Sequence, residues 1–165
     1  MKFWGAQFNP ESLTRSFTFS SFEDLEGSDH VDDLRGDFGN NRIDGGAGAD
    51  AIDGAEGDDT IAGEEGADFL FGGEGRDWVD YSASNAGVTV SLDVDDVNSG
   101  GHAEGDQLRA FENIQGSNFN DSLTGSDVNL PDVAGFSAAL PETDGNNTID
   151  PGIGRDTVDG GGGND

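Results

Sequence analysis

The sequence predicts an all-β fold, a solenoid of short strands joined by tight turns, and three observations support this. Residues 36–80 form five consecutive nonapeptides with one shared pattern. Positions one and four are always glycine, position six is Asp or Asn, and position eight is always aliphatic. A fixed short period of this kind is typical of repeat proteins, in which each unit buries its apolar face by stacking on its neighbours.

Each nonapeptide divides into a turn and a short strand. Glycine at positions one and four permits backbone angles that residues with a Cβ avoid. In the three residues that follow position six, only the middle one is reliably apolar, as expected for a strand with one inward face. If successive strands alternate between two sheets, one sheet stacks Ile43, Ile61 and Val79, and the other stacks Leu34, Ile52 and Leu70.

One aliphatic side chain per repeat makes a thin core. The entropy lost when a whole repeat is ordered exceeds what burial of one such side chain returns. Packing alone therefore does not stabilise this fold, and another interaction is needed.

The acidic residues at position six supply that interaction. Turns two repeats apart lie on the same side, which pairs Asp32 with Asp50, Asn41 with Asp59, Asp50 with Asp68, and Asp59 with Asp77. Without a counter-charge these carboxylates repel one another. Calcium accepts about six to eight oxygen ligands in flexible geometry and fits such a site better than magnesium. The sequence therefore predicts several bound Ca²⁺ ions.

The nonapeptides resemble the hemolysin-type calcium-binding repeats of the RTX (repeats-in-toxin) family. The resemblance implies a parallel β-roll, in which Asp side chains and turn carbonyls hold stacked calcium ions. The expected side-chain ligands are Asp32, Asn41, Asp50, Asp59, Asp68, Asp77, Asp156 and Asp165. The expected turn ligands are Gly45, Ala47, Gly48, Gly54, Glu56, Gly57, Gly63, Glu65, Gly66, Gly72, Glu74 and Gly75.

Composition limits the other possibilities. The net charge of −28 makes nucleic acid and anionic membranes poor partners, and we expect a monomer without membrane insertion. The chain has no cysteine, so disulfides and thiolate metal sites are excluded. Residues 1–22 lack the apolar run of a secretory signal peptide. The plain alternative for the repeats is a flexible acidic linker, which does not keep five aliphatic residues in register.

Four segments are expected: a flank or cap at 1–21, a first repeat block at 22–80, an insert at 81–115, and a second, interrupted block at 116–165. Within the flank, the alternation from Leu13 to Phe19 predicts a strand that caps the roll or belongs to a preceding part of a longer protein. Residues 126–144 are expected to form a surface loop. The final repeat stops at its position-six Asp165, which suggests a truncated chain and makes pairing of Asn147 with Asp165 doubtful.

Residues 22–36 and 111–125 resemble each other, and each introduces a block. Their position four is His30 or Phe119 instead of glycine. We expect entry turns in which this large side chain closes the end of the roll and ion binding is weaker.

The insert resembles a segment that commonly punctuates RTX arrays, through Asp80-Tyr81-Ser82, residues 87–92 and residues 105–108. Val88, Val90 and Leu92 predict one longer strand that packs against the preceding roll. Three aromatic residues precede the insert at outward positions: Phe69, Phe71 and Trp78. Either the insert covers them, or they form a ligand or partner surface.

No enzymatic site is predicted. The acids recur at a fixed period without a singular constellation, His30 and His102 lie in turn or loop contexts, and no G-x-S-x-G or P-loop is present. We expect a module that folds on binding Ca²⁺ and stabilises or assists secretion of a larger extracellular or cell-surface bacterial protein, with type I secretion machinery as its partner. The alternatives are an adhesion or ligand-binding module that uses the aromatic face, and an accessory region of a secreted hydrolase.

Overall fold

The computed structural model describes residues 23–93, 96, 98–126, 147–161 and 165. The strand expected between Leu13 and Phe19 lies outside these residues, as does nearly all of the loop expected at 126–144. Within the described chain the fold is all-β, with one short 3-10 helix, η1 (Gly101–Ala103). No helix in this part of the chain is long and apolar enough to cross a membrane.

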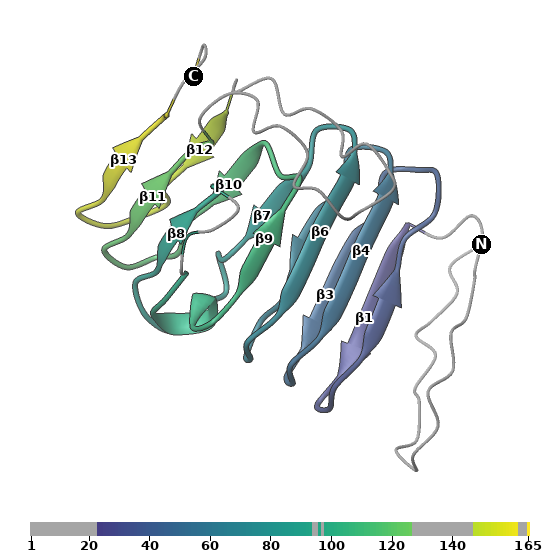
Figure 1. Ribbon diagram of the computed structural model, residues 1–165. Coiled ribbons are helices and arrows are strands. Elements are labelled where there is room, and N and C mark those ends of the chain that lie inside the picture. The colour runs from purple at the N-terminus through teal and green to yellow at the C-terminus, as the bar shows by residue number, and fades with distance from the viewer. Residues whose placement is uncertain (1–22, 94–95, 97, 127–146, 162–164) are drawn as a thin grey trace.

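Parallel strands stack along one axis in two layers (Figure 1). One layer is a six-stranded sheet, in the order β1 (Asp24–Ser28), β3 (Arg42–Gly46), β5 (Thr60–Ala62), β7 (Trp78–Asp80), β10 (Asn113–Gln115) and β12 (Thr148–Asp150). A four-stranded sheet contains β2 (Asp33–Arg35), β4 (Ala51–Glu56), β6 (Phe69–Glu74) and β9 (Gln107–Arg109). A three-stranded sheet contains β13 (Thr157–Asp159), β11 (Ser122–Thr124) and β8 (Thr89–Ser91).

The strand register confirms the predicted alternation between sheets. Ile43 pairs with Ile61 and Ile61 with Val79 in the six-stranded sheet. Leu34 pairs with Ile52 and Ile52 with Leu70 in the four-stranded sheet. Position eight therefore forms the core, and the sequence period places one fully buried aliphatic side chain in each strand between β3 and β7.

The insert differs from its expected form. The strand predicted from Val88 to Leu92 is only the three residues of β8, and β9 and β10 continue the two ladders of the preceding roll. Leu108 lies beside Leu70, and Ile114 lies beside Val79. These residues still place an aliphatic side chain at the inward position of a strand, although the turns before them lack the glycine pattern.

The expectation that large position-four side chains close the end of the roll is wrong. His30 is exposed, and 46% of the Phe119 surface is exposed. The strands around Phe119, β10 and β11, each have a neighbour on both sides in their sheets. The second entry turn therefore lies within the roll, and its side chain points away from the core.

Candidate metal centre

The position-six side chains stack at the predicted spacing. The Asp50 N–H donates to Asp68 Oδ1, and the Asp59 N–H donates to Asp77 Oδ1, each at 2.8 Å. The same bond joins the Asp32 N–H to Asp50 Oδ1 and the Asn41 N–H to Asp59 Oδ1. Each carboxylate therefore uses one oxygen to hold the preceding turn of its stack.

The second oxygen of four of these carboxylates has no partner. Among the described residues, buried side-chain oxygens without a hydrogen bond are the Oδ2 atoms of Asp50, Asp59, Asp68 and Asp77. These side chains are at most 2% exposed. A buried, charged oxygen without a hydrogen bond is costly unless a counter-ion compensates it. A cation beside the four orphaned oxygens would compensate their charge.

Glycine at position one keeps space open beside each orphaned oxygen. A Cβ built on Gly45 would lie 2.8 Å from both Asp50 Oδ2 and the Gly63 carbonyl oxygen. A Cβ on Gly54 would likewise meet Asp59 Oδ2 and the Gly72 carbonyl oxygen. Carboxylate and carbonyl oxygens bordering one small space are the hard donors that calcium prefers.

Side chains alone do not form a metal cage here. No three His, Cys, Asp or Glu side chains cluster around a possible metal position in the described part of the chain. Each turn contributes one carboxylate, so any ion bound here takes its remaining ligands from backbone carbonyls or water. The sequence likewise predicts that turn carbonyls supplement the Asp side chains.

Other predicted turn residues lie in the same stacks. The carbonyls of Glu65 and Glu74 at position three accept the N–H groups of Gly48 and Gly57, at 2.8 Å. Ala47 forms a parallel bridge with Glu65. The position-four glycines run close to the turn below, and a Cβ on Gly48 would lie 2.8 Å from the His30 carbonyl oxygen. Glycine is needed here because the turns are in van der Waals contact.

Burial alters the protonation of the orphaned carboxylates. It raises the pKa of Asp50 and Asp77 to about 6 and that of Asp59 to about 7, from an ordinary value of 3.8. The pKa of Asp68 is raised for the same reason. Nearby carboxylates add to the shift at Asp50, Asp59 and Asp77. The fold therefore disfavours the charged form unless a cation is close.

The predicted ligands outside this group of four have other surroundings. Asp32 Oδ2 accepts hydrogen bonds from Ser28 N and Ser28 Oγ, both at 2.8 Å. Asn41 Oδ1 accepts the Asp37 N–H at 2.8 Å. Asp156 Oδ1 accepts the Asp121 N–H at 3.0 Å, and Asp165 Oδ1 accepts the Asn147 N–H at 2.9 Å. The pairing of Asn147 with Asp165 is thus present.

Two stacking carboxylates were missed in the sequence. Asp106 Oδ1 accepts the Asp68 N–H at 2.9 Å, and Glu112 Oε2 accepts the Asp77 N–H at 2.8 Å. Both lie two residues before an inward aliphatic residue, Leu108 or Ile114, as position six does in a regular repeat. That spacing is the signal that could have identified them, since the glycine pattern around them is lost.

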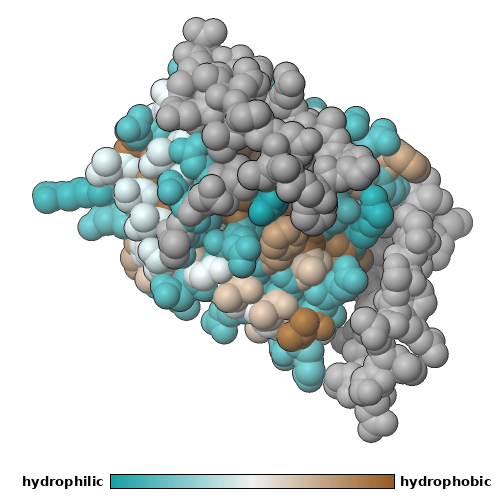
Figure 2. Space-filling model, in the orientation of Figure 1, coloured by the Kyte–Doolittle hydropathy of each residue, from teal (hydrophilic) through white to brown (hydrophobic). Residues whose placement is uncertain are grey.

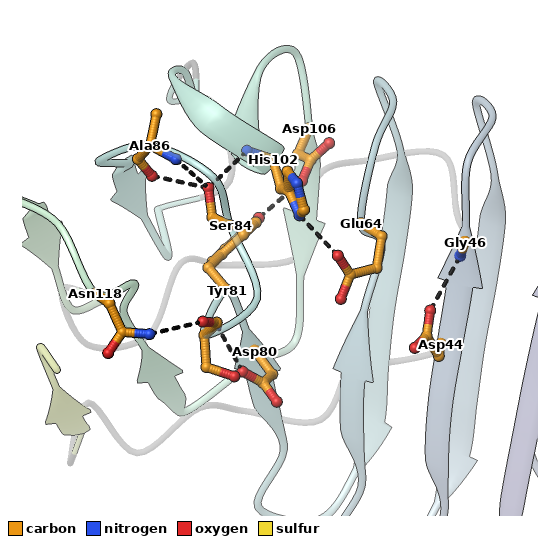
Figure 3. Close-up of polar contacts among 11 residues, drawn as sticks. Asp44, Gly46, Glu64, Asp80, Tyr81, Ser84, Ala86, His102, Asp106 and Asn118 are labelled. Atoms are coloured by element: carbon orange, nitrogen blue, oxygen red, sulfur yellow. Dashed lines mark hydrogen bonds and ion pairs between the residues drawn. The ribbon is translucent and has the colours of Figure 1, made fainter.

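The insert is held to the roll by protein groups (Figure 3). Asp106 Oδ1 accepts the Asp68 N–H of the roll, and within the insert the Tyr81 hydroxyl donates to Asp106 Oδ2 at 2.8 Å, so both Asp106 oxygens have partners. His102 Nδ1 lies 2.7 Å from Glu64 Oε2. Burial is also the main cause that raises the pKa of Asp106, to about 7, and the pKa of Glu64.

The aromatic residues before the insert do not form one face. Phe69 and Phe71 belong to β6 in the four-stranded sheet, whereas Trp78 belongs to β7 in the six-stranded sheet. Phe69 is 42% exposed, and the Arg109 guanidinium of the insert lies 5.9 Å from its ring centre. The insert thus runs beside Phe69 and leaves it partly open. On the side seen in Figure 2, apolar residues are interspersed among hydrophilic ones.

Comparison with known protein families supports calcium as the ion that this chain binds. The model of the RTX calcium-binding nonapeptide repeat matches in four copies, over residues 26–61, 53–85 and 143–165. These matches cover all five nonapeptides and the four orphaned carboxylates. The comparison with curated proteins gave no match. The chain belongs to the RTX calcium-binding nonapeptide repeat family and is a calcium-binding β-roll module.

Proposed function

We propose that this chain is a module that folds when calcium binds and thereby stabilises a larger secreted protein. The observation that supports this is the row of four buried Oδ2 atoms without a hydrogen-bond partner. Calcium binds the folded turns and not the extended chain, because the oxygens of one site come together only in the roll. Each site then adds about 2.7 kcal/mol to stability when free calcium is about a hundredfold above its dissociation constant.

The proposed location is extracellular or at the cell surface. Calcium sites of extracellular modules bind in the range of ~10⁻⁴ to 10⁻³ M, so they are loaded outside the cell and empty in cytosol. A chain with a net charge of −28 repels itself when no cation is bound, which favours an extended form suited to export by a type I secretion system. We propose that the module acts as a monomer within its parent protein.

We also propose that the module itself is not an enzyme. Ser84, His102 and Glu64 are the residue types of a nucleophile, a base and an acid, and they lie near one another in Figure 3. However, Ser84 Oγ accepts the backbone N–H of His102 at 3.0 Å and donates to the Ala86 carbonyl at 2.8 Å. A nucleophile would instead hydrogen-bond to the imidazole ring. This contact therefore fixes the loop.

Circular dichroism in the far ultraviolet tests the coupling of calcium to folding. The chain is titrated with calcium from a chelator-treated start, with magnesium in a parallel sample. We expect a cooperative gain of β signal at or below millimolar calcium and no comparable gain with magnesium. A β spectrum that is already complete in chelator would contradict the proposal.

A further inference from the structure

The regular turns share an unusual backbone at position two. In the turns that end in the four orphaned carboxylates, this residue has a positive φ angle. The four residues are Gly46 (90°), Ala55 (81°), Glu64 (67°) and Gly73 (120°). Positive φ is uncommon for residues with a Cβ and costs them about 1 to 2 kcal/mol. Because Ala55 and Glu64 adopt it, the turn itself imposes this conformation.

A second class of turns has an ordinary φ at position two. Ser28, Asp37, Ser117 and Ser126 are absent from the positive-φ residues of the described chain. The N–H of each donates to the side chain of the residue that precedes the next strand. In the first three this is position six of the same nonapeptide, whereas Ser126 and Asn147 lie on either side of residues 127–146, which are outside the described chain. The acceptors are Asp32 Oδ2 (2.8 Å), Asn41 Oδ1 (2.8 Å), Asp121 Oδ2 (2.8 Å) and Asn147 Oδ1 (2.9 Å). These turns satisfy their own acceptor and are called closed turns below, whereas those with the orphaned oxygen are called open turns.

The peptide bond explains why the two classes exclude each other. The carbonyl of position one and the N–H of position two belong to one plane and point in opposite directions. A peptide that aims its N–H at the carboxylate occupies it with a hydrogen bond. In an open turn that hydrogen bond is absent, and the oxygen stays available to a cation.

Two turns with the same surroundings isolate this difference. A Cβ on Gly45, in an open turn, would lie 2.8 Å from Asp50 Oδ2 and 2.8 Å from a carbonyl oxygen of the next turn. A Cβ on Gly116, in a closed turn, would lie 2.8 Å from Asp121 Oδ2 and 2.8 Å from the Pro151 carbonyl oxygen. Both aspartates are buried. The turns differ in that Ser117 N and Ser117 Oγ both donate to Asp121, at 2.8 and 2.7 Å.

The choice of residue at position six agrees with the two classes. All four open turns carry Asp, whereas two of the four closed turns carry Asn. The amide suits a closed turn, because Asn41 Nδ2 donates back to Asp37 Oδ1 and Asn147 Nδ2 donates back to Ser126 Oγ, each at 3.3 Å. A neutral side chain is sufficient where no cation has to be held.

We propose that the backbone at position two selects which turns of this chain bind calcium. Open turns, at Asp50, Asp59, Asp68 and Asp77, take the ions, whereas closed turns, at Asp32, Asn41, Asp121 and Asn147, replace the ion with a backbone N–H. This inference rests on the proposed function, since it assigns the calcium sites of the same roll. Asp156 and Asp165 follow positive-φ glycines but are not buried, so they are not counted among the open turns, whose carboxylates are buried.

Calcium counting on matched variants tests the selection rule. Bound calcium is measured by equilibrium dialysis with radioactive calcium, in excess magnesium that occupies loose surface carboxylates. Asp50→Asn in an open turn is compared with Asp121→Asn in a closed turn. We expect Asp50→Asn to lose one bound ion and Asp121→Asn to keep the full number. Ser117→Gly, which frees Asp121 and permits positive φ, is expected to gain one ion.

Ala55→Gly serves as the control, because it places glycine in a turn that is already open and leaves the number of ions unchanged. An equal loss in Asp121→Asn and Asp50→Asn overturns the selection rule while leaving calcium binding intact. A folded Ser117→Gly variant without an added ion also overturns it. If Ser117→Gly does not fold, the two Asp→Asn variants still decide. A wild-type chain that binds no calcium overturns the proposed function instead.

Discussion

The turns between β3 and β7 and the turns that follow β7 belong to the same roll but are held in different ways. In the first region four buried carboxylates keep an oxygen without a hydrogen bond. In the second region protein groups meet the equivalent oxygens, as Tyr81 does for Asp106 and Ser117 does for Asp121. The core side chains continue through both regions, so the difference between an ion-dependent and a self-sufficient turn lies in the turn residues alone.

Removal of calcium should have the largest effect on stability, because it affects the turns of the first region and not those of the second. With about 2.7 kcal/mol per loaded site at a hundredfold excess, the four open turns together outweigh any single side chain. Thermal unfolding should therefore occur at a much higher temperature in calcium than in chelator, and magnesium should not replace calcium. Equal melting temperatures in calcium and chelator would remove the distinction between the two regions.

Core packing should have the second largest effect on stability, and this effect should be larger for a side chain in the interior of the roll than for one at its edge. Leu70 is fully buried between Ile52 and Leu108, whereas Val158 on the edge strand β13 is 46% exposed. Leu70→Ala should lower the free energy of unfolding by about 2 to 5 kcal/mol in calcium. Val158→Ala should lower the free energy of unfolding by clearly less. Denaturant unfolding of both variants measures the two losses, and a larger loss in Val158→Ala would contradict the assignment of Leu70 to the core.

Loss of the hydrogen bond between Tyr81 and Asp106 should lower stability by a smaller amount. This bond lies in the second region, where protein groups satisfy the carboxylates. Tyr81→Phe removes a buried donor and leaves Asp106 Oδ2 unsatisfied, which should cost about 1 to 3 kcal/mol in chemical denaturation. Ser82→Ala is the control, because Ser82 is exposed and next in sequence. The number of calcium ions bound should stay the same in both variants; loss of an ion in Tyr81→Phe would mean that the hydroxyl supports an ion site.

Acid should also change the stability of the roll, in a direction that depends on calcium. The raised pKa values, about 6 for Asp50 and Asp77 and about 7 for Asp59, mean that the ion-free roll binds more protons than the unfolded chain. The contribution of these carboxyl groups to the stability of the ion-free roll is fully present at a pH below their unfolded pKa of 3.8. It is lost as the pH rises through their folded pKa values of about 6 to 7. Without calcium, β signal should therefore be greater at pH 5 than at pH 8.

Calcium affinity should change in the opposite direction, because protons compete with the ion for the same oxygens. The calcium concentration at half-saturation should be higher at pH 5 than at pH 8. A half-saturation point that does not move with pH would show that the buried aspartates are not the ligands.

The sequence was sufficient for the regular part of the molecule. The period of nine predicted both sheets, and Ile43, Ile52, Ile61, Leu70 and Val79 are the core residues that it placed inward. It also predicted the stacking of position-six residues eighteen apart, because the solenoid geometry follows directly from the repeat.

The irregular part could not be predicted in the same way. β9 continues the four-stranded sheet and β10 the six-stranded sheet. The long turn before β9 and the short turn before β10 break the nine-residue period, so the sequence does not reveal these strands. The positive φ of Ala55 and Glu64 was also not visible, since neither residue favours that conformation by itself. These features depend on stacking between turns distant in sequence, which a local pattern does not record.

Hydrogen exchange resolved along the chain, in calcium and in chelator, tests the central claim most directly. The amides of Asp50 and Asp59 donate to Asp68 and Asp77, so their protection reports whether the carboxylate stacks are formed. We predict strong protection across residues 42–80 in calcium and its loss in chelator. Equal protection of these residues in both conditions would contradict the account, because the buried carboxylates would then be stable without an ion.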